Sequence, residues 1–99
     1  MGKPVTRLGD KTTGHGPWLP RPSTGASSDV FANGIGVVRV GDTWAPHNGV
    51  PNGTHRGEVG IGSSGSGTVF ANGKAVARIG DAVEADTIAA GSSNVFAGG

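Results

Sequence analysis

Hydrophobic residues in this chain occur in short runs separated by glycine, asparagine and serine. One run reads Val-Phe-Ala and occurs at residues 30–32, 69–71 and 95–97, followed by Asn-Gly in the first two copies and by Gly-Gly in the third. Val-Phe-Ala favours a short strand, and Asn-Gly favours a two-residue type I′ turn because both positions need positive φ. No run of ten residues shows helical periodicity, so the pattern predicts strands and tight turns with little or no helix.

A second phrase, apolar-x-Arg-apolar-Gly-Asp, alternates with the first and ends at Asp10, Asp42 and Asp81. The sequence therefore predicts one hairpin over residues 31–42 and another over residues 70–81. The chain begins with the second phrase and ends with the first, so we expect residues 95–97 to pair with residues 5–7 and close a ring. The predicted fold class is all-β, a small glycine-rich β-pyramid of three pseudo-threefold-related hairpin repeats. The alternative is a meander of three unrelated hairpins.

Length and composition limit what such a fold can be. Ninety-nine residues make a single domain, 1–99, with a thin core, and the absence of cysteine excludes disulfides. A bound metal is another way to fasten a small domain. The net charge of +1, without a basic run, gives no footprint for nucleic acid. The sequence also has no classical signal peptide and no apolar segment near the ~20 residues of a membrane helix.

The histidines suggest where that metal would bind. His15 and His47 each lie five residues after the aspartate of a Gly-Asp phrase, the same offset in the third repeat is Asp86, and His55 follows in the longest loop. Threefold symmetry would bring the equal offsets together. Three imidazoles, with or without a carboxylate, suit Zn²⁺ in tetrahedral geometry, and iron or nickel also accepts imidazole ligands. The alternative is that the histidines are ordinary exposed loop residues.

Other repeated residues allow two interpretations each. Val30, Val69 and Val95 lie either on an exposed apolar base or in the core behind it. The three arginines of the second phrase either pair with the aspartates of the same phrase or contact a partner; they are Arg7, Arg39 and Arg78.

The two alternating phrases, with a Ser-Gly-Ser-like lead-in, resemble the PAAR-repeat family over essentially the whole chain. The resemblance implies a cone whose base sits on the end of a trimeric β-helical spike and whose tip holds a metal. His15, His47 and His55 match positions of that site, whereas Asp86 stands where the family usually has cysteine. The implied role is the tip of a contractile phage tail (in the virion) or of a type VI secretion system, aiding membrane penetration.

From that resemblance we expect one copy per spike trimer, a monomer when free, transient contact with the pierced membrane, and no enzymatic activity or catalytic residue. The alternative function is a small zinc-dependent hydrolase using the same histidines, with Glu58 as the only obvious general base. No His-Glu-x-x-His sequence supports that alternative.

Overall fold

The computed structural model describes residues 2–14, 19–45, 60–83 and 86–98. Over these ranges the chain forms ten strands of two residues each, arranged as five two-stranded antiparallel sheets. The described residues contain no helix, and so none that is long and apolar enough to cross a membrane. The predicted all-β class is confirmed.

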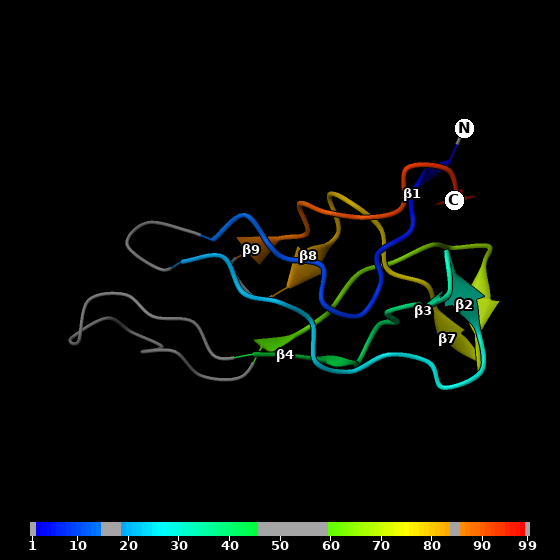
Figure 1. The fold of residues 1–99 in the computed structure, drawn as a ribbon, viewed down its shortest axis with the longest axis horizontal. Coiled ribbons are helices and arrows are strands. Elements are labelled where there is room, and N and C mark those ends of the chain that lie inside the picture. Colours follow the sequence, from blue (N-terminus) through cyan, green and yellow to red (C-terminus); the bar gives the residue numbers. More distant parts are fainter. Residues whose placement is uncertain (1, 15–18, 46–59, 84–85, 99) are drawn as a thin grey trace.

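Three of the sheets lie at one end of the molecule, together with both termini (Figure 1). They pair β2 (Phe31–Ala32) with β3 (Ile35–Gly36), β6 (Phe70–Ala71) with β7 (Lys74–Ala75), and β1 (Lys3–Pro4) with β10 (Phe96–Ala97). We call these three sheets the hairpin layer. The predicted turns are present, because Asn33 and Gly34 have φ of 56° and 77°, and Asn72 and Gly73 have 55° and 78°.

The pairing of β1 with β10 closes the ring, as the sequence predicts, but in a different register. Phe96 faces Pro4 and Ala97 faces Lys3, so β10 pairs two residues earlier than the predicted partner, residues 5–7. The same register joins Phe31 to Gly36 in the first hairpin. Val5 still donates its N–H to the Val95 carbonyl at 2.9 Å, but the Thr6 N–H and carbonyl bond in a central ring, which explains the shift.

The central ring joins the second phrases of all three repeats. The N–H groups of Thr6, Val38 and Ala77 donate to the carbonyls of Ala77, Thr6 and Val38 at 3.0, 3.0 and 2.8 Å, a closed cycle. The prediction that the hairpins extend to Asp42 and Asp81 is therefore wrong. After β3 and β7, the chain leaves the strand that it pairs with in the hairpin and joins this ring. Buried backbone groups need hydrogen-bond partners, and the other two repeats supply them.

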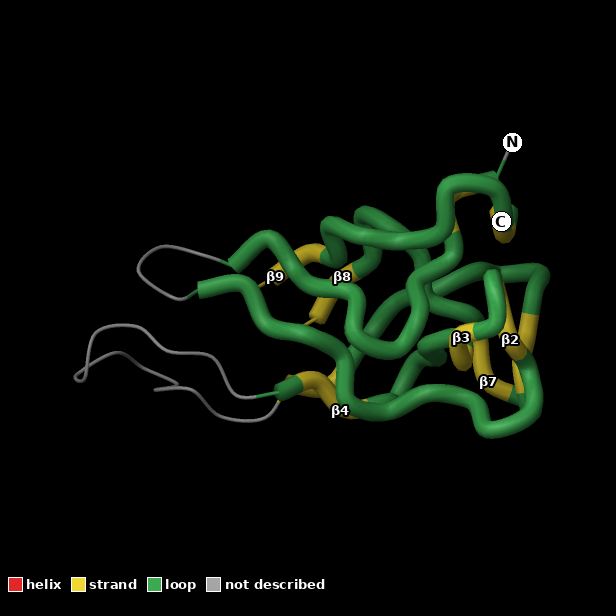
Figure 2. The backbone as a smooth tube through the Cα atoms, viewed as in Figure 1, coloured by secondary structure: helices red, strands yellow, loops and turns green. Residues whose placement is uncertain are grey.

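A second layer is formed by the arms of the loops that follow each Gly-Asp. It contains β4 (Thr43–Trp44) with β5 (Gly60–Ile61), β8 (Ala82–Val83) with β9 (Asp86–Thr87), and a bridge between Lys11 and Pro22. Single bridges close this loop layer around the axis, joining Ser23 to Trp44, Gly62 to Val83 and Thr12 to Ile88. Figure 2 shows β4, β8 and β9 away from the end that carries β2, β3 and β7.

Each layer has its own small core. In the hairpin layer the core consists of three valines and three alanines, one of each from every repeat: Val5, Val37, Val76, Ala32, Ala71 and Ala97. In the loop layer the core is less regular: Val38, Trp44, Ala77, Val83 and Ile88, with Ala26 packed against it.

Candidate functional site

The hairpin layer exposes one apolar pair per repeat. Phe31, Phe70 and Phe96 are 56%, 56% and 54% exposed. The valines that precede them, Val30, Val69 and Val95, are 38%, 40% and 36% exposed. Three large aromatic side chains this exposed on so small a protein indicate a surface meant to be covered by a partner. We call these six residues the Val-Phe face.

Strand alternation explains why phenylalanine, and not alanine, is exposed. Neighbouring residues of a strand point to opposite faces, and in each Val-Phe-Ala run the alanine is buried, at 2%, 1% and 1% exposure. Only a small side chain fits at the centre of three converging hairpins, so the phenylalanine occupies the outer face. The valine before each phenylalanine is also exposed, at 36–40%, so these three residues lie on the surface and not in the core, although strand alternation alone would point them the same way as the alanines. Sequence reasoning did not single out the phenylalanines, although the alternation with alanine could have identified them.

The arginines of the second phrase hold the turns behind this face. The Nε atoms of Arg7, Arg39 and Arg78 lie 3.0, 2.8 and 3.0 Å from an Oδ2 of the aspartate three residues later in the same phrase. In each case the arginine backbone N–H also donates to that oxygen. Hydrogen bonding to Asp42 raises the pKa of the Arg39 guanidinium above its ordinary value. Of the two interpretations of these arginines, pairing with aspartate is the one found.

The glycine of each Gly-Asp makes this turn possible. Gly9, Gly41 and Gly80 have φ of 92°, 94° and 93°, a conformation that costs other residues steric strain. The aspartate N–H then donates to the arginine carbonyl three residues back, which places the two side chains together.

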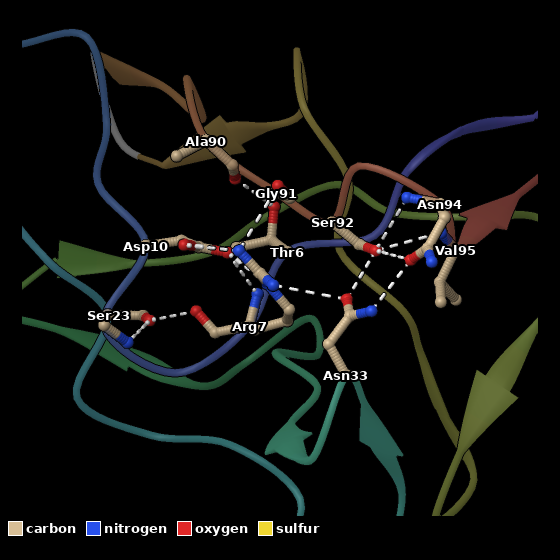
Figure 3. A network of polar contacts seen from close by, with 11 residues as sticks. Thr6, Arg7, Asp10, Ser23, Asn33, Ala90, Gly91, Ser92, Asn94 and Val95 are labelled. Atoms are coloured by element: carbon tan, nitrogen blue, oxygen red, sulfur yellow. Dashed lines mark hydrogen bonds and ion pairs between the residues drawn. The ribbon is translucent and has the colours of Figure 1, made fainter.

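The asparagine of each Asn-Gly turn joins one repeat to another. Figure 3 shows Asn33 between Arg7 and Ser92. Its Oδ1 accepts from Arg7 at 3.2 Å and from the Ser92 hydroxyl at 2.6 Å, and its Nδ2 donates to Asn94 at 2.7 Å. These contacts connect parts of the chain far apart in sequence and fix the Val-Phe face in position.

Asn72 makes the same kind of connection at the second corner. Its Oδ1 accepts from Arg39 at 2.9 Å, and its Nδ2 donates to Asp29 at 2.7 Å. Hydrogen bonds from Asn72 and then from Ser27 lower the pKa of Asp29. At the third corner, where Gly98 replaces asparagine, the Gly98 carbonyl accepts from Arg78 at 3.0 Å and also from the Ser66 hydroxyl. A backbone oxygen thus takes the place of the amide oxygen.

Of the four predicted metal ligands, only Asp86 lies among the described residues. His15, His47 and His55 lie outside the described residues, so the structure does not place them. Asp86 is described: it lies in β9, is 2% exposed, and its Oδ2 accepts from the Thr12 hydroxyl at 2.7 Å. The same oxygen lies 3.3 Å from Arg21 Nε, in an ion pair whose two side chains are both 0% exposed.

The strand register assigns Asp86 a different position from the one its offset suggests. Asp86 faces Val83, on the returning arm of a very short loop. The corresponding returning position in the second loop is Gly60, which faces Trp44, and in the first loop it is Arg21, next to the Lys11–Pro22 bridge. The register therefore makes Asp86 the structural counterpart of Gly60 and Arg21, on the returning arms of three loops of different length.

Together these features define a class: over the described residues, a closed, pseudo-threefold β-domain with one symmetric apolar end and a loop layer whose side chains differ between repeats. A comparison with protein families agrees. The PAAR motif model matches residues 13–87 and again 48–99, and the chain belongs to this family. A search of curated proteins found no match. Proteins of this family are structural spike-tip components of contractile injection systems and sit on a spike protein.

Proposed function

We propose that this protein is the metal-fastened tip of the central spike of a contractile phage tail or of a type VI secretion system. In that role it caps a trimeric β-helical spike through the Val-Phe face and aids penetration of the target membrane. The observation that carries the proposal is the near-equal exposure of Phe31, Phe70 and Phe96. A partner with three identical chains would meet three near-identical contacts.

The stoichiometry follows from the internal repeat. Closed symmetry normally arises from identical subunits, and here three repeats within one chain present equivalent surfaces. One copy per spike trimer satisfies all three chains of the partner. The loops that carry His15, His47 and His55 would then point away from the spike, since β4 and β8 lie away from the hairpin end (Figure 2).

The proposed metal would join the loop ends. Three imidazole donors are a set that zinc binds well, and iron is the second choice. His15, His47 and His55 would hold the ion, and the chemistry it supplies is structural. Asp86 stays a predicted fourth ligand, although its carboxylate already compensates Arg21 and accepts from Thr12.

The deciding experiment is mass measurement of the complex with the purified trimeric spike protein from the same genome. We expect one copy per trimer, and we expect the triple variant Phe31→Ser, Phe70→Ser, Phe96→Ser to lose binding. Leu19→Ser is the matched control, because Leu19 is also exposed, at 58%, but belongs to the first loop and not to the hairpin layer. Three copies per trimer, or full binding by the triple variant, would show that the spike contacts another surface.

A further inference from the structure

The hairpin layer departs from threefold symmetry at one exposed position. In each sheet one residue faces the buried alanine of the Val-Phe-Ala run: Ile35 faces Ala32, Lys74 faces Ala71 and Lys3 faces Ala97. All three are exposed, Ile35 at 38%. The fold therefore presents one isoleucine and two lysines at equivalent exposed positions of a layer whose valines and phenylalanines are equal in all repeats.

A trimeric partner cannot match this difference residue by residue. Its three chains are identical, so the same side chain approaches Ile35, Lys74 and Lys3. The partner's residue must be acceptable beside both an apolar and a cationic side chain, in every one of the three rotational positions in which the domain can sit.

A carboxylate does not meet that requirement. Two copies of the carboxylate would pair with Lys74 and Lys3. The third copy would be covered by Ile35 and would have no opposite charge beside it. Burying an uncompensated charge is costly, and the cost would offset much of what the two exposed ion pairs contribute.

An apolar side chain does meet it. Against Ile35 it forms an ordinary hydrophobic contact, and against Lys74 and Lys3 it packs on the methylene stem while the ammonium stays in water. Resting on the proposed function, we infer that the spike presents a ring of three identical apolar side chains at this position of the hairpin layer. Ile35 then makes the strongest of the three contacts, because its whole side chain is apolar.

An apolar ring and an acidic ring on the spike predict changes of opposite sign in the binding affinity of the same variants. Ile35→Lys should weaken binding to the purified spike trimer about tenfold, and Lys74→Ile and Lys3→Ile should each tighten it about threefold. The affinity should change little between about 50 and 300 mM salt, because no ion pair is formed across the interface. Binding is measured by titration calorimetry with the full chain.

An acidic ring would give the reverse: Ile35→Lys would bind more tightly, Lys74→Ile more weakly, and both effects would shrink in salt. That result would overturn the inference while leaving the proposed function intact, and so would unchanged affinity in all three variants. Failure of the wild-type chain to bind the trimer would instead overturn the proposed function. Thermal unfolding of each variant provides the control, and these exposed substitutions should leave the melting temperature nearly unchanged.

Discussion

The hairpin layer and the loop layer have the same pseudo-threefold backbone pairing but very different side chains. In the hairpin layer the buried positions are filled by three valines and three alanines. In the loop layer the inward positions after Gly-Asp hold Thr12, Trp44 and Val83, each buried, and the returning arms add the buried pair Arg21–Asp86. Backbone symmetry therefore does not require side-chain symmetry.

The difference teaches where the symmetry is needed. The hairpin layer lies under the face proposed to contact a threefold partner, so unequal buried side chains in its core would tilt the contact. The side chains of the loop layer need not be equal in the three repeats. Its interior includes one tryptophan and one ion pair. Among the described residues, Trp44 Nε1 is buried without a hydrogen-bond partner, whereas the serine buried at the start of each hairpin (Ser27, Ser66 and Ser92) accepts from the backbone N–H of the valine three residues later.

The largest effect we expect in this comparison is on the loop end, from metal removal. If His15, His47 and His55 hold a zinc ion, stripping it should lower the free energy of unfolding by an amount on the order of 10 kcal/mol. Replacing any one of these histidines by alanine should abolish stoichiometric metal by elemental analysis. Thr13→Ala is the control, since Thr13 is exposed in the first loop. If the metal-free protein were equally stable, the three histidines would be ordinary exposed loop residues.

A second effect concerns the buried pair of the loop layer. Asp86→Asn removes the carboxylate that compensates Arg21, so urea unfolding should show a loss of about 3–5 kcal/mol. Asp29→Asn is the matched control, because Asp29 is exposed and should cost far less. Metal content gives a second measurement: it should fall in Asp86→Asn only if Asp86 is a ligand.

The double variant Arg21→Met, Asp86→Leu separates charge compensation from packing. Removing both charges leaves no uncompensated group, so part of the stability lost in Asp86→Asn should return. If Asp86→Asn unfolds at the same urea concentration as the wild type, the pair does not hold the first and third loops together.

A smaller effect compares equivalent pairs within the hairpin layer. Arg78 and Asp81 are each 6% exposed, whereas Arg7 and Asp10 are 19% and 15% exposed. Because the same hydrogen bonds are worth more when shielded from water, Asp81→Asn should cost about 2–3 kcal/mol and Asp10→Asn about 1 kcal/mol. Equal losses in chemical unfolding would show that burial does not distinguish these two turns.

The smallest effect is a pH dependence at one corner. Hydrogen bonds from Asn72 and Ser27 lower the pKa of Asp29 below its ordinary 3.8. A carboxyl group whose folded pKa is lowered adds stability above its unfolded pKa, and the contribution is lost as the pH falls through the folded value. Stability should therefore decrease slightly more as the pH falls below about 4 in the wild type than in Asp29→Asn. Identical acid profiles by circular dichroism would contradict this role.

Much of the hairpin layer could be predicted from the sequence because its determinants are local. Asn-Gly specifies the turn at residues 33–34 and again at 72–73, Gly-Asp specifies the turns behind them, and the repetition of both phrases indicates a ring. The Arg39–Asp42 pair also follows from a spacing of three residues across one turn. Each of these features depends on a few neighbouring residues, so the pattern of the chain is enough to predict it.

The register of that ring and the position of Asp86 were decided by tertiary structure. Residues 5–7 pair with the other two repeats because three buried arms meet at one axis, and no local signal states that β10 must then pair with β1 at Lys3 and Pro4. In the same way, Asp86 has the offset of His15 and His47 in the sequence, but the short third loop places it opposite Val83, next to Arg21. Spacing counts residues along the chain, whereas position around an axis depends on how long each loop is before it returns.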